Sequence, residues 1–85
     1  MSIAKLIRSF CDDCGCNYYE KYSGRGMFGR YCAGIVTDRN MIEVILELAD
    51  YLHECGVDNV KEELGKMCYD NLGLDMVVYF PSISS

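Results

Sequence analysis

Apolar residues recur at helical spacing close to the start of the chain. They occupy positions i, i+3, i+4, i+7, i+8 and i+11, and they are Ile3, Leu6, Ile7, Phe10, Cys11 and Cys14. This spacing is typical of an amphipathic helix with one buried face. Ser2 is placed to cap the helix and Gly15 to end it. The pattern therefore predicts a helix over residues 3–14.

Two β-forming runs follow. Residues 17–23 are rich in tyrosine, and residues 31–37 contain small and β-branched side chains. If the first run is extended, Tyr18, Glu20 and Tyr22 share one face of it, because side chains alternate along a strand. The glycine-rich segment between the two runs predicts an antiparallel pair of strands.

The middle of the chain predicts two consecutive helices. Asn40 and Glu43 resemble a capping box in front of a buried stripe made of Met41, Ile42, Ile45, Leu48, Ala49 and Leu52. Gly56 is placed to end this helix, and Asp58 to cap a second one. The second helix is expected to be buried through Val60, Leu64, Met67, Cys68 and Leu72, and to end near Gly73.

Residues 74–80 predict one more strand, which Pro81 should end because proline cannot donate a hydrogen bond in a central strand. Residues 82–85 are expected to be frayed. The predicted order is therefore α-β-β-α-α-β, which gives an α+β fold with one compact two-layer domain over residues 1–85. In it, helices cover a small three-stranded antiparallel sheet. The open edges of such a sheet favour a homodimer, although no residue decides it.

Composition agrees with a small soluble protein. The chain is 51% hydrophobic and 25% charged, with one proline. No stretch approaches the roughly 20 apolar residues that span a bilayer, and the N-terminus lacks the apolar core of a secretion signal. We therefore expect an intracellular protein without a membrane partner.

Charge is divided unevenly between the two halves. Residues 1–39 carry a net charge of +2 and residues 40–85 carry −7. Glu43, Glu47, Asp50 and Glu54 follow one another at helical spacing and form an acidic stripe. The stripe disfavours direct nucleic-acid binding and favours a protein with a basic surface, although charges of this kind also simply solvate helix faces.

The segment Gly24–Arg30 contains three glycines and two arginines between Tyr22 and Tyr31, and we call it the glycine–arginine loop. Arg25 and Arg30 supply guanidinium groups suited to carboxylates or phosphates. The segment satisfies G-x-G-x-x-G, but a strand follows it, whereas a dinucleotide site requires a helix there. It is interpreted as a recognition loop for an acidic group. A nucleotide site and an ordinary hairpin connection are the alternatives.

Catalytic and metal-binding residues are not expected. His53 is the only histidine, and on a helix it points away from Cys55, so a Cys–His nucleophile is not expected. Cys11, Cys14, Cys16 and Cys32 could supply thiolates to zinc, but a second closely spaced pair is missing. We expect reduced cysteines that pack in the core, with no metal and no cofactor; a small zinc-stabilised module is the alternative.

The segment from Tyr22 to Val36 resembles small phage-encoded or prophage-encoded proteins that are similar in size and acidity to anti-CRISPR inhibitors. The resemblance covers 15 of 85 residues and transfers no functional residue. It implies a non-enzymatic inhibitor that acts in the cytoplasm of a bacterial host cell. Such a protein would bind a host defence protein, such as a CRISPR-Cas effector, through the acidic helix and the glycine–arginine loop.

Overall fold

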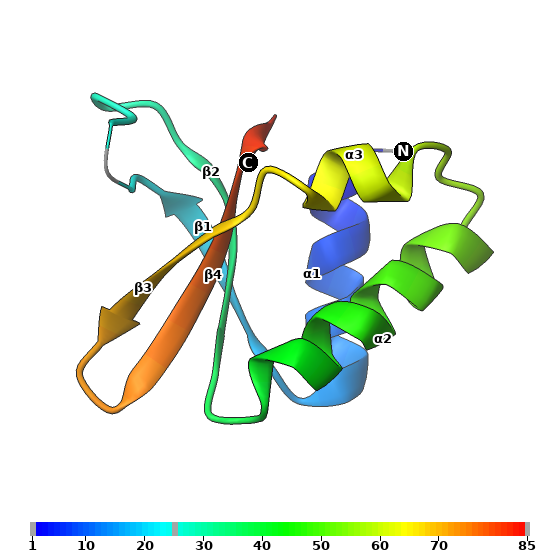
Figure 1. Ribbon diagram of the computed structural model, residues 1–85, viewed down its shortest axis with the longest axis horizontal. Helices are drawn as coiled ribbons and strands as arrows, with labels where there is room; N and C mark the ends of the chain where they lie inside the picture. The colour runs from blue at the N-terminus through cyan, green and yellow to red at the C-terminus, as the bar shows by residue number, and fades with distance from the viewer. Residues whose placement is uncertain (1, 25, 85) are drawn as a thin grey trace.

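The computed structural model describes residues 2–24 and 26–84. Within them, three helices lie against one face of a four-stranded sheet (Figure 1). The elements are α1 (Ile3–Cys14), β1 (Asn17–Tyr22), β2 (Cys32–Thr37), α2 (Met41–Glu54), α3 (Val60–Leu64), β3 (Cys68–Leu72) and β4 (Asp75–Ser84). Every strand pair is antiparallel, and the order across the sheet is β1-β2-β4-β3. The predicted α+β class is confirmed, whereas the predicted three strands are wrong.

The ends of the first two helices follow the predicted signals. The Ser2 hydroxyl accepts a hydrogen bond from the Lys5 N–H at 3.3 Å, and Gly15 ends α1 with a φ of 75°. The Asn40 side chain accepts bonds from the N–H groups of Ile42 and Glu43 at the start of α2. Short polar side chains and left-handed glycine thus satisfy backbone groups that a helix leaves unpaired at its ends. None of the helices in the described part of the chain could cross a membrane.

The predicted second helix is largely replaced by a hairpin. Helix α3 ends at Leu64, and Cys68–Leu72 forms β3, which pairs with β4. A two-residue turn at Gly73 and Leu74 joins the two strands, with Gly73 at a φ of 66°. The predicted cap at Asp58 is also wrong, because Asn59 occupies the N-cap position and makes no capping bond with its side chain.

The end of the chain is also more ordered than predicted. Strand β4 lies inside the sheet and continues past Pro81. Pro81 is tolerated because it falls where the pairing with β2 is irregular, between Ala33 opposite Phe80 and Cys32 opposite Ser84. Ile83 is buried in the core, so residues 82–84 are not frayed.

A bulge in β1 separates two residues that were predicted to share a face. The pairing with β2 shifts between Tyr19 and Tyr22, and Lys21 lies in the left-handed region with a φ of 57°. Tyr18 consequently packs on the helix side of the sheet and Tyr22 on the opposite side. An extra residue of this kind changes which side chains face the core.

The sheet is packed on both faces. The inner face, which carries Ile35, Val78 and Phe80, forms the main core with the helices. The outer face carries a second cluster made of Tyr22, Met27, Cys32, Val77 and Tyr79. Neighbouring residues of β4 belong to different clusters, as the alternation of side chains along a strand requires.

Candidate docking surface

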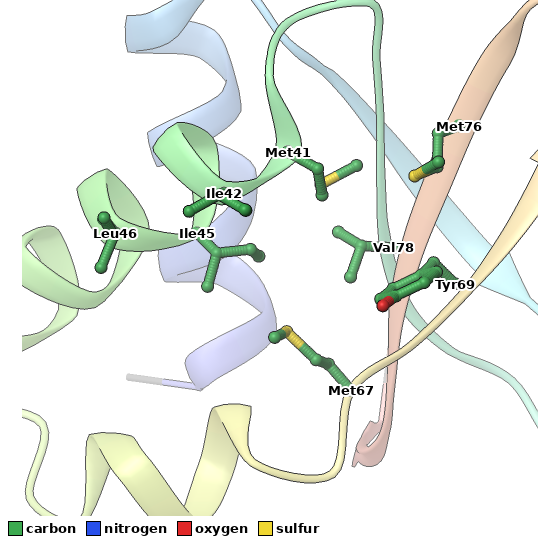
Figure 2. Close-up of a pocket in the computed structure, with 8 residues that line it drawn as sticks. All are labelled: Met41, Ile42, Ile45, Leu46, Met67, Tyr69, Met76 and Val78. Carbon is green, nitrogen blue, oxygen red and sulfur yellow. The ribbon is translucent and has the colours of Figure 1, made fainter.

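An apolar groove of about 330 Å³ lies between the first half of α2 and the hairpin of β3 and β4. Figure 2 shows that its walls come from segments far apart in the sequence. The lining residues are Met41, Ile42, Ile45, Leu46, Met67, Tyr69, Met76 and Val78. All eight present apolar groups or an aromatic ring, so the groove can take apolar side chains, and its described lining residues offer no charged group for chemistry.

The rim of the groove exposes large apolar side chains. Ile42 is 73% exposed, and Leu46 and Tyr69 are each 63% exposed. We call the pair Ile42 and Leu46 the ridge; they lie one turn apart on α2. Isolated exposed apolar residues are ordinary, but three of them beside one apolar groove are typical of an interaction surface.

The ridge exists because α2 is apolar over a wider arc than the core can cover. Val44, Leu48 and Leu52 are fully buried, and they set the rotation of the helix. Ile42 and Leu46 are then left outside. The prediction that Ile42 belongs to the buried stripe is wrong for this reason. Leu46 and Tyr69 did not enter the predicted site, although an apolar residue at i+4 from Ile42 was a usable signal.

The groove continues toward α3. A second hollow of about 290 Å³ lies between α2 and α3 and shares Ile45 and Met67 with the first. It is lined as well by Ala49, Val60, Lys61, Leu64 and Gly65. Together the two hollows follow α2 from Met41 to Ala49, which corresponds to about 12 Å of helix.

The acidic stripe borders the ridge. Glu43, Glu47, Asp50 and Glu54 are all exposed, and Glu43 and Glu47 directly follow Ile42 and Leu46 in the chain. Glu47 forms an ion pair with Arg39, so the stripe is partly neutralised at that point. Exposed ion pairs contribute little to stability, and a competing basic group can replace Arg39 at low cost.

The glycine–arginine loop contributes to the outer cluster of the sheet. Met27 is only 3% exposed, and its sulfur lies 3.8 Å from the Cys32 sulfur. Gly24 lies against Tyr79 so closely that a Cβ there would overlap the ring. The glycine–arginine loop is therefore packed against the outer face of the sheet through Gly24 and Met27.

Much of the loop backbone is already hydrogen-bonded. The N–H groups of Met27 and Arg30 donate to the carbonyls of Gly24 and Met27, and the Gly24 N–H points to the Met27 sulfur. These three amides are not available to a phosphate. The geometry of the described loop residues gives no support to the nucleotide alternative.

The predicted loop anchors have different environments. Tyr22 is buried, and its hydroxyl donates to the Asp70 carboxylate at 2.6 Å. Burial, and then the neighbouring Asp70, raises the pKa of Tyr22 above its ordinary value of 10.0. Tyr22 is therefore a packed residue and not a surface anchor. Arg30 and Tyr31 are exposed, and Arg25 lies outside the described residues.

The cysteines are free thiols in contrasting environments. Cys11, Cys16 and Cys32 are buried, whereas Cys55 and Cys68 are exposed. Burial raises the pKa of Cys11 from 9.0 to about 12, and the Cys14 and Cys16 sulfurs lie 3.4 Å apart. Within residues 2–24 and 26–84, no three Cys, His, Asp or Glu side chains converge where they could hold a metal ion. The zinc alternative thus has no support from this geometry.

The structure separates the predicted site residues into two groups. The acidic residues lie on α2, with Glu43 and Glu47 next to the ridge, whereas Tyr22 at the end of β1 packs on the outer face of the sheet and Arg30 and Tyr31 lie at the end of the glycine–arginine loop. Comparisons of the chain with protein-family models, with characterised proteins and with solved structures found no match.

Proposed function

We propose that the chain is a non-enzymatic interaction protein that binds the basic surface of a partner protein. The observation that carries the proposal is the position of the exposed ridge, Ile42 and Leu46, between an apolar groove and the acidic stripe of α2. Apolar contact would supply the affinity, and the carboxylates would select a basic partner and steer its approach.

The net charge of −5 is a further support, since it favours association with positively charged proteins and opposes contact with nucleic acid. A host defence protein that binds nucleic acid would present a basic surface of this kind. The inhibitory role implied by the resemblance to phage proteins is proposed on that basis.

Site-specific photo-crosslinking tests the proposal. A photoreactive amino acid is placed at position 46, on the ridge, and in a matched control at Leu74, which is fully exposed at the β3–β4 turn and lies outside the groove. In extracts of a bacterial host, position 46 should crosslink one basic protein that position 74 does not. Equal labelling at both positions would contradict the proposal.

The crosslinked protein is then purified and its affinity is measured at two salt concentrations. Glu43→Lys, Asp50→Lys and Glu54→Lys are combined, while Glu47 is retained because it is paired with Arg39. The triple variant should bind more weakly and lose most of its salt dependence. If affinity and salt dependence stay unchanged, the acidic stripe has no part in binding.

A further inference from the structure

The groove also indicates the kind of structure that its partner presents. Two neighbouring hollows, which share Ile45 and Met67, lie along α2, one facing the β3–β4 hairpin and the other facing α3. About 12 Å of length corresponds to a little over two turns of an α-helix. A helix of that length can place apolar residues at i, i+3 or i+4, and i+7 along such a surface.

Methionine is concentrated here. Met41, Met67 and Met76, which are three of the five methionines in the chain, line the groove. Figure 2 shows the three methionines spread around Val78. Methionine is flexible and polarizable, and grooves that accept amphipathic helices commonly use it.

The exposed carboxylates of α2 favour one kind of occupant for the groove over another. On the ridge side, Glu43, Asp50 and Glu54 are exposed without an ion pair among the described contacts, so a helix lying over the ridge would place its flank beside carboxylates. Binding of a second copy of the chain is disfavoured. In that copy, the exposed apolar residues of α2 stand beside the same acidic stripe, so the two stripes would repel each other. The lining itself contains one charged side chain in the described residues, Lys61, at the α3 end.

A strand fits this surface less well than a helix does. A strand added to the free edge of β3 would lie in the plane of the sheet, about 4.8 Å beyond β3. It would leave the ridge on α2 uncovered. A helix seated between α2 and the hairpin covers the ridge and Tyr69 together, at the separation of 8–10 Å that is usual between packed helices.

We propose that the groove and ridge bind one basic amphipathic α-helix of the partner, with its apolar face in the groove and its lysines or arginines beside the acidic stripe. This inference rests on the proposed function and specifies the form of its ligand. A partner that crosslinks at position 46 through a non-helical segment would refute the helix while the proposed function stands. Absence of any specific crosslink would refute both.

Three synthetic peptides test the proposal directly. The first contains leucine and lysine with leucine at helical spacing over about 18 residues, a length at which helix formation is practicable. The second has the same composition with strict alternation, which favours a strand. The third replaces the lysines of the first by glutamate. Binding to the full chain is measured by fluorescence anisotropy, and helix formation by circular dichroism.

The first peptide should bind and gain helix, and the other two should bind at least about tenfold more weakly. Leu46→Glu should weaken binding of the first peptide about tenfold or more, because it places a carboxylate against the apolar contact. Leu74→Glu is the matched control and should leave affinity unchanged. Unchanged dichroism of each variant confirms that it folds.

Equal binding of the alternating peptide, or full binding by Leu46→Glu, would overturn the proposal. A second copy as occupant is tested by sedimentation. A dimer that Leu46→Glu dissociates would show that the groove binds another copy of this chain, and would also overturn it.

Discussion

The two faces of the sheet differ in how their apolar side chains are covered. On the outer face, the glycine–arginine loop folds back and buries Met27 against Cys32 and Tyr79. On the inner face, the helices leave a groove open and expose Ile42 and Leu46 on α2. The loop, whose composition predicts recognition, therefore closes a core, whereas α2, whose apolar stripe predicts packing, also exposes part of its apolar surface.

The difference follows from packing constraints. A small domain has few elements with which to cover a sheet, and folding buries only about 60% of the surface that the unfolded chain exposes. The loop is held by Met27, and the rotation of α2 is set by Val44, Leu48 and Leu52. Apolar residues outside those contacts remain on the surface, where they are available to a partner.

The largest difference in stability is expected between variants on the buried side of α2 and variants on its exposed side. Leu48→Ala should lower the free energy of unfolding by about 3 kcal/mol, because it opens a cavity in the main core. Leu46→Ala should change it by less than about 0.5 kcal/mol, since Leu46 is 63% exposed. Urea denaturation measures both values. Similar losses for the two variants would show that the ridge belongs to the core.

A second prediction concerns the loop. Met27→Ala should cost about 2 kcal/mol, whereas its neighbour Phe28→Ala should cost little, because Phe28 is 96% exposed. Loss of the Met27 side chain should also expose the Cys32 thiol and speed its alkylation. Alkylation of Cys11, which lies in the main core, should stay slow. Peptide mass spectrometry of iodoacetamide-treated native protein measures both rates. A stable Met27→Ala variant with a protected Cys32 would show that the loop is only a connection.

A smaller effect is expected from the buried hydroxyl of Tyr22. Tyr22→Phe should lower stability by about 1 kcal/mol, because the bond to Asp70 is lost. The raised pKa of Tyr22 means that its neutral form stabilises the fold below pH 10.0, and that this contribution is lost as the pH rises above that value. Thermal unfolding between pH 7 and 12 should therefore show a shallower alkaline decline for Tyr22→Phe than for the parent. Equal declines would show that ionisation of Tyr22 does not contribute to the loss of stability at alkaline pH.

The sequence predicts the parts of this fold that local signals control. Ser2, Gly15, Asn40 and Gly56 mark the ends of α1 and α2, because capping depends on neighbouring residues. Strand β3 is missed because Leu64, Met67 and Cys68 also match helical spacing, and only its pairing with β4 reveals the strand. Long-range pairing of this kind overrides local propensity.

The acidic part of the candidate site can also be predicted from local spacing, whereas the environments of Tyr22 and Ile42 cannot. Helical spacing places Glu43, Glu47, Asp50 and Glu54 on one exposed face, and the structure exposes all four. The burial of Tyr22 depends on the bulge near Lys21, and the exposure of Ile42 depends on which part of the apolar arc meets the sheet. Both depend on strand pairing or packing between segments that are far apart in the sequence.

In the proposed function, the α2 groove and not the glycine–arginine loop is the docking surface. A matched pair of tyrosines tests it, since Tyr69 at the groove is 63% exposed and Tyr31 beside the loop is 54% exposed. Calorimetric titration of the helical leucine–lysine peptide with each variant should give about a tenfold loss of affinity for Tyr69→Ser and none for Tyr31→Ser. A loss of affinity confined to Tyr31→Ser would contradict the proposed docking surface and would place binding at the glycine–arginine loop.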